Sequence, residues 1–144
     1  MYKKSVEAFI PSAMALIERH MAESNLEVPK VYKGYISSMG AAMIQSGLLP
    51  TLAVFSAPKS DSAGADRRKL MRTLTEMLRE VMPNTYGAMP PLDDNPGEDE
   101  DRLLRYANLF SGNPGRLRAI RQDVTHASVA IKLALRTFKL VGNL

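Results

Sequence analysis

Residues 34–58 form a run of 25 positions without a charged side chain, the longest such run in the chain. A membrane-spanning helix needs about 20 continuous apolar residues. Here Gln45, Ser46 and Gly47 divide the run into two short halves, and other hydroxyl side chains make each half more polar. The run therefore predicts a buried pair of helices and no partnership with a membrane.

The first half of this run continues an amphipathic pattern that begins just before it. Its main apolar positions, which recur at helical spacing, are Tyr32, Ile36, Met39 and Met43. Tyr35, Ala42 and Ile44 widen the apolar face, so we expect this helix to be buried on most sides.

The second half predicts another helix directly after the first. Gly47 can adopt the left-handed conformation that ends a helix without a Cβ penalty. Pro50 fits a first turn because it lacks only an N–H that would be unpaired there, and apolar residues continue to Phe55. The two halves together predict a tight helical hairpin.

The hairpin also carries a family resemblance. Tyr32 and Tyr35 are followed by GAAMIQSGL from Gly40 to Leu48 and by TLAVF from Thr51 to Phe55. This order resembles the signature of the Cmr-type small α-helical subunit of type III-B CRISPR RNA-guided effector complexes. The order of helices expected over the whole chain is also similar to that family.

The resemblance implies a function in antiviral defence. It implies a non-catalytic scaffold subunit without a cofactor, which stacks along the effector filament and helps to hold target RNA while neighbouring subunits cut. The implied partners are the repeated backbone subunit, the large polymerase-like subunit, copies of the chain itself, and guide and target RNA through their backbones.

Composition agrees with a single helical domain. A chain of 144 residues fits one core, and its low aromatic content with nine methionines favours helix packing over a sheet. Without cysteine there is no disulfide or thiolate nucleophile, and without a signal-peptide pattern we expect a cytoplasmic protein. We predict an all-α bundle of about five to six helices around the central hairpin, with an acidic, irregular loop at about 83–96.

Charge is strongly segregated along the sequence. Six acidic residues fall within residues 93–101, whereas Asp123 is the single acidic residue after position 101, beside eight basic ones. This segregation favours binding of a polyanion, or docking of an acidic surface on a basic neighbour. The spacing of the acidic cluster does not fit a calcium loop because Pro96 and Gly97 interrupt it.

Three helices are expected outside the hairpin in addition to the last one. One runs from about Lys4 to Ala22, with a kink at Pro11 or a true start near Ile10, and is followed by a polar connection over residues 23–30. A second runs from Asp66, its expected cap, to Met82. A third begins at Asn95-Pro96 and ends at residues 111–115.

The helix over residues 66–82 carries the first predicted nucleic-acid-binding site. Its apolar face contains Leu70, Leu74, Met77 and Val81. On nearly the opposite side the pattern predicts an exposed basic surface made of Arg68, Arg72 and Arg79.

The last helix, expected over residues 116–141, carries the stronger predicted site. An unbroken seam at spacings of 3 and 4 comprises Leu117, Ile120, Val124, Ala127, Ile131, Ala134, Phe138 and Val141. The cations expected on the other side are Arg118, Arg121, Lys132, Arg136 and Lys139. We expect Lys132, Arg136 and Lys139, extended by Arg118 and Arg121, to contact RNA phosphates. The alternative for the three cations near the C-terminal end is a favourable interaction with the negative end of their own helix. A second apolar strip with Val129, Leu133 and Leu140 faces either the domain's own core or another subunit.

No catalytic constellation is evident. His20 and His126 lie on different predicted helices, and Asp123 with His126 at i, i+3 is interpreted as a surface polar pair. The alternative to the scaffold subunit is a helix-turn-helix-like DNA-binding transcriptional regulator, because short helices with basic faces suit that function as well.

Overall fold

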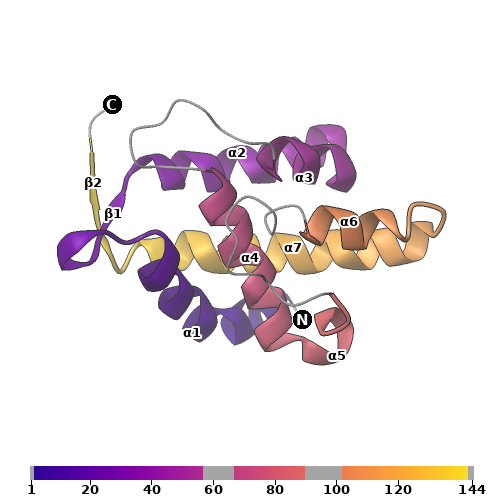
Figure 1. Cartoon of the computed structure of the whole chain (residues 1–144), viewed down its shortest axis with the longest axis horizontal. Helices are drawn as coiled ribbons and strands as arrows, with labels where there is room; N and C mark the ends of the chain where they lie inside the picture. Colours follow the sequence, from indigo (N-terminus) through magenta and orange to yellow (C-terminus); the bar gives the residue numbers. More distant parts are fainter. Residues whose placement is uncertain (1, 57–66, 90–101, 143–144) are drawn as a thin grey trace.

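The computed structural model describes residues 2–56, 67–89 and 102–142, and this part of the chain is almost entirely helical. The all-α prediction is confirmed. Figure 1 shows the elements along the chain. They are α1 (Tyr2–His20), a 3₁₀ turn η1 (Ser24–Leu26), β1 (Glu27–Pro29), α2 (Val31–Ser46), α3 (Leu48–Ser56), α4 (Arg67–Val81), α5 (Pro83–Tyr86), α6 (Arg102–Asn108), α7 (Pro114–Leu135) and β2 (Lys139–Val141).

Helix α1 forms where the sequence predicts a helix and runs through Pro11. A start near Ile10 is therefore wrong, since the helix begins at Tyr2. The buried apolar side chains of α1 are Val6, Phe9, Ala13, Leu16 and Ile17. Met21, directly after the helix, is buried as well. Pro11 itself is exposed, on the side of α1 turned away from this core.

The predicted hairpin is confirmed as α2 and α3. Gly47 separates the two helices with a φ of 91°, and its N–H donates to the Met43 carbonyl at 3.1 Å. The expectation that α2 is buried on most sides is wrong, because Ile44 is 78% exposed. Ile44 lies about 100° around the helix from Met43, which places it off the buried stripe.

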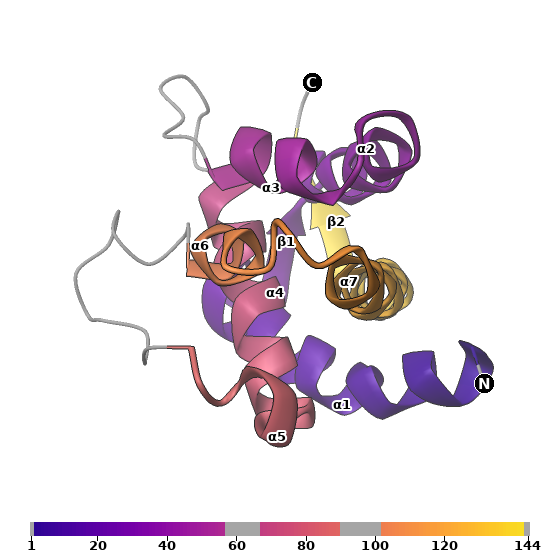
Figure 2. The ribbon, with the colours of Figure 1, turned by 90° about the vertical axis from the view of Figure 1, so that its right-hand side faces the viewer.

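Helix α4, not the hairpin, is the most enclosed element of the described part. It contacts α1, α2, α3, α5 and α7, and Figure 2 shows it between α1 on one side and the hairpin on the other. Even two hydroxyls on α4 are buried: Thr73 donates to the Lys69 carbonyl at 2.9 Å, and Thr75 to the Met71 carbonyl at 2.7 Å. Bonding within the helix allows these polar groups to face the core.

The last helix ends six residues earlier than predicted. After Leu135 the chain turns, and Lys139–Val141 pairs in parallel with Glu27–Pro29 in the register Glu27↔Lys139 and Pro29↔Val141. The residues expected to be a polar connection thus contain β1. Apolar residues in the C-terminal segment fit helix and strand spacing equally well, so the long-range pairing decides the outcome.

The connections around α5 and α7 also differ from the expectation. Pro83–Tyr86 forms one helical turn inside the segment predicted to be irregular. The Asn113 side chain accepts the N–H of Arg116 at 3.1 Å and caps α7, which therefore begins at Pro114. The predicted helix start at Asn95-Pro96, the Asp66 cap and the acidic cluster lie outside the described residues.

Candidate nucleic-acid interface

The arginines of α4 do not form the exposed surface predicted for them. Arg68, Arg72 and Arg79 are all half-buried, because α4 is surrounded by other helices. Nε of Arg72 lies 3.8 Å from Oε1 of Glu76, and Nε of Arg79 is buried without a hydrogen-bond partner among the described residues. The prediction of an exposed basic ridge on this helix is wrong.

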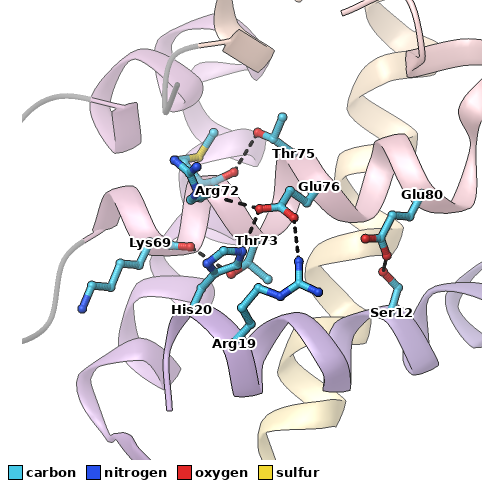
Figure 3. A network of polar contacts seen from close by, with 10 residues as sticks. Ser12, Arg19, His20, Lys69, Arg72, Thr73, Thr75, Glu76 and Glu80 are labelled. Atoms are coloured by element: carbon cyan, nitrogen blue, oxygen red, sulfur yellow. Dashed lines mark hydrogen bonds and ion pairs between the residues drawn. The ribbon is translucent and has the colours of Figure 1, made fainter. Parts of the chain in front are cut away.

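Glu76 instead centres a polar network between α1 and α4 (Figure 3). Its Oε1 lies 2.7 Å from Nε2 of His20, and its Oε2 accepts a bond from Nη1 of Arg19 at 3.4 Å. Partial burial acts to raise the pKa of the Glu76 carboxyl, but the hydrogen bond and charge of His20, together with Arg19 and Arg72, outweigh it and hold the pKa below its ordinary value. The network joins two helices and leaves no free carboxylate there.

The cations of α7 do lie together on an exposed surface. We define the α7 cationic face as Arg118, Arg121, Lys132 and Arg136, all of which are exposed. At 100° per residue the four positions fall within a sector of about 60°, and they span roughly 27 Å along the axis. Within the described ranges none of the four forms an ion pair.

Lys139 does not belong to this face. It lies on β2 beyond the end of α7, and its Nζ is 3.5 Å from Oε2 of Glu27 on β1. The prediction that Lys132, Arg136 and Lys139 project from one side of a single helix is therefore wrong for Lys139.

Helix α7 is held firmly by its opposite side. Its buried residues are Ile120, Val124, Ala127, Ser128, Ala130, Ile131, Ala134 and Leu135. It packs on α1, α2 and α4, and Figure 2, which looks nearly along α7, shows α2 and α1 on two sides of it. The cationic face is therefore carried on a helix whose position is fixed.

A second polar network attaches α7 to α5 and α6. The Tyr86 hydroxyl donates to Oδ2 of Asp123 at 2.6 Å, so Asp123 turns to the interior and away from the cationic face. Burial and the Asp123 carboxylate raise the pKa of Tyr86 far above its ordinary value, which keeps this hydroxyl a donor. Nη2 of Arg116 donates to the Tyr106 hydroxyl at 2.8 Å, which itself donates to the Thr85 carbonyl at 2.8 Å.

A groove of about 300 Å³ runs between α2 and α7, beside the cationic face. We call it the α2–α7 groove. Its lining residues are Ile36, Ser37, Gly40, Met43 and Ile44 of α2, and Arg121, Thr125, Ser128, Val129 and Lys132 of α7. The groove thus combines an apolar floor with two cations. Ile44, which the sequence pattern places on the buried face of α2, is instead exposed in this groove.

The described part of the chain holds neither a metal-binding cluster nor a membrane-spanning helix. Over residues 2–56, 67–89 and 102–142, no group of three or more acidic or histidine side chains is arranged to hold a metal ion. Within those ranges none of the helices has both the length and the apolar character needed to cross a bilayer.

The fold and surface define a small single-domain α-helical protein with a cationic helix face. The family model described as CRISPR-associated protein (Cas_Cmr5) matches residues 11–106. Because this match spans two thirds of the chain, the chain belongs to the Cmr5 family and is a Cmr-type small subunit of the type III-B CRISPR complex. No curated protein and no solved structure matches the chain. Helix α7 lies beyond the matched residues, so the cationic face is a feature of the structure and not of the match.

Proposed function

We propose that this chain is a non-catalytic scaffold subunit that helps to hold target RNA in the type III-B complex by means of the α7 cationic face. The observation that carries the proposal is the gathering of Arg118, Arg121, Lys132 and Arg136 on one exposed side of a firmly packed helix. Family membership supports association with other Cmr subunits. In this proposal copies of the chain stack along the filament, beside the repeated backbone subunit and the large polymerase-like subunit.

The chemistry of the face suits phosphates. Four cations on one helix side can replace the counterions of an RNA backbone, a contribution that does not depend on base sequence. Since the guide pairs with the target and reads its sequence, the scaffold has to hold the backbone only. Because α7 is packed on three helices, little freedom is lost by the helix when RNA binds.

The DNA-binding regulator is the competing function. A recognition helix contacts base edges mainly with residues of its N-terminal part. In α7 the four cations instead extend over roughly 27 Å, from the second turn to the end of the helix. This distribution favours contacts along a nucleic-acid backbone.

Binding of the purified full chain to single-stranded RNA, a guide–target duplex and double-stranded DNA tests the proposal. We expect Lys132→Glu/Arg136→Glu to abolish RNA binding. Lys33→Glu/Arg105→Glu, which changes the net charge equally on α2 and α6, should retain it. Equal loss in both variants would mean that only total charge matters, and tight binding to one DNA sequence would favour the regulator.

A further inference from the structure

The α2–α7 groove offers more than phosphate binding requires. Phosphates are bound by cations and gain nothing from an apolar floor. Here Ile36, Met43 and Ile44 line the same groove as Arg121 and Lys132, and Ile44 remains 78% exposed. A ligand that covers this side chain would gain the favourable free energy of its burial.

The charge of the lining restricts the ligand. Arg121 and Lys132 are the charged residues among the groove's lining, and both are cations. They are 11 positions apart, which places them on the same side of α7 and roughly 16 Å apart along its axis. A ligand that fits has anionic groups near both ends of the groove and an apolar surface between them.

The polar side chains of the groove leave few specific donors for such a ligand. The Thr125 hydroxyl donates to the Arg121 carbonyl at 2.8 Å, and the Ser128 hydroxyl lies 3.7 Å from the Met39 sulfur in hydrogen-bonding geometry. With two of the three lining hydroxyls engaged and Ser37 the third, recognition relies mainly on the faces of the ligand and on its charge. Contact with the face of a nucleobase is of this kind and tolerates any base.

Gly40 supports the existence of an occupant. Glycine inside a helix is less stable than alanine by roughly 0.5–1 kcal/mol. A Cβ at Gly40 would meet no atom of the described chain within 4 Å, so packing within this protein does not require glycine there. The missing side chain leaves open space in the wall of the groove.

We infer that the α2–α7 groove accepts an unstacked base of bound RNA, with phosphates further along the strand on either side of that base held by Arg121 and Lys132. The inference rests on the proposed function. It adds that the protein binds RNA more tightly than a polyanion without bases, and that it does so without reading the base sequence. A segment of a partner protein with apolar and acidic side chains is the alternative occupant that the test has to separate.

The test compares a 12-nucleotide single-stranded RNA with an analogue of equal length and charge that lacks half its bases. Wild-type full chain should bind the complete RNA about fivefold more tightly, the effect expected when about 40 Å² of apolar surface stays in water. Gly40→Leu fills the groove and Ile44→Ser removes part of its floor, and neither changes the charge. Both variants should lose the preference for complete RNA and bind both oligonucleotides equally.

The matched control is Val54→Ser. Val54 is 52% exposed on α3 and lies outside the groove lining, so its replacement should preserve the fivefold preference. Circular dichroism of each variant verifies that it is folded.

Three results would overturn the inference in distinguishable ways. If wild type binds both oligonucleotides equally and Lys132→Glu/Arg136→Glu loses RNA binding, the protein has a phosphate-binding surface but no base-binding groove. No dependence on those cations would remove the proposed function as well. Unchanged RNA preference in Gly40→Leu, with loss of the variant from the reconstituted effector complex, would assign the groove to a partner protein.

Discussion

Nε2 of His20 and Oε1 of Glu76 lie 2.7 Å apart, which joins the end of α1 to the middle of α4. Both side chains are largely buried, with exposed fractions of 15% and 16%. In the sequence His20 is the single histidine of its helix, and its partner is 56 positions away. A local pattern carries no information on such a contact.

This contact predicts how stability depends on pH. The pKa of Glu76 is lowered in the folded protein, so its ionised form stabilises the fold above the ordinary value of 4.5. That contribution is lost as pH falls below 4.5 and through the folded pKa. We expect Glu76→Gln to cost roughly 1.5–3 kcal/mol at pH 7, the range for hydrogen bonds to charged groups.

Urea unfolding of wild type and Glu76→Gln between pH 7 and pH 3 measures this prediction. The difference between the two should shrink as pH falls below about 4.5. Glu80→Gln is the control, since Glu80 accepts a bond from Ser12 at 2.9 Å but is exposed. A difference between wild type and Glu76→Gln that stays constant down to pH 3 would contradict the assignment of the pKa shift.

Two glycines of the hairpin should respond oppositely to alanine. Gly47 has a φ of 91° and a ψ of 178°, a conformation that costs an L-residue roughly 1–3 kcal/mol, so Gly47→Ala should destabilise the protein. Gly40 lies within α2 and has open space at its Cβ position, so Gly40→Ala should stabilise the protein by roughly 0.5–1 kcal/mol. Thermal unfolding of the two variants checks both signs. Destabilisation by Gly40→Ala would contradict the prediction that a Cβ is accommodated there.

The parts of the fold that the sequence predicts correctly are those set by neighbouring residues. The turn at Gly47 and the buried stripes of α1, α2 and α7 follow from local conformation and helical spacing. The parallel pairing of β1 with β2 joins residues more than 100 positions apart, and no local signal announces it. The end of α7 at Leu135 follows from that pairing.

The candidate site was predictable only in part for the same reason. Arg118, Arg121, Lys132 and Arg136 are exposed because one helix places them opposite its own apolar seam. The exposure of Arg68, Arg72 and Arg79 depended on how many neighbours surround α4, which periodicity does not reveal. Prediction of the α2–α7 groove would have required the relative placement of α2 and α7. The angular position of Ile44, off the buried stripe of α2, was a usable signal of its exposure.

The polar network that attaches α7 to α5 and α6 should stabilise the fold. Tyr86→Phe removes the 2.6 Å bond to Asp123, which should cost roughly 1.5–3 kcal/mol because the acceptor is charged. Unfolding of Tyr86→Phe, Asp123→Asn and the double variant forms a double-mutant cycle. A coupling energy near zero would contradict the importance of the bond. RNA binding of Tyr86→Phe should be unchanged where the variant is folded.

The last prediction separates RNA contact from helix-dipole stabilisation on α7. Lys132 lies in the last turn and Arg136 directly follows the helix, where a cation gains roughly 0.3–1 kcal/mol from the dipole without any ligand. Arg118 and Arg121 lie beyond the first turn, where the dipole has little effect. The dipole account therefore predicts a lower melting temperature for Lys132→Ala/Arg136→Ala alone, and no change in RNA binding for either pair.

Under our assignment both pairs contact phosphates. Lys132→Ala/Arg136→Ala and Arg118→Ala/Arg121→Ala should each lower the slope of log K against log salt by about 1.4, from about 0.7 per lost contact with a single strand. The measurement is RNA binding at several salt concentrations, with the melting temperature of each variant recorded in parallel. A slope that falls for both pairs, whatever the melting temperatures do, supports a continuous RNA surface along α7. A slope that changes for neither pair, with lower stability of the C-terminal pair alone, would leave the dipole as the full explanation of these cations.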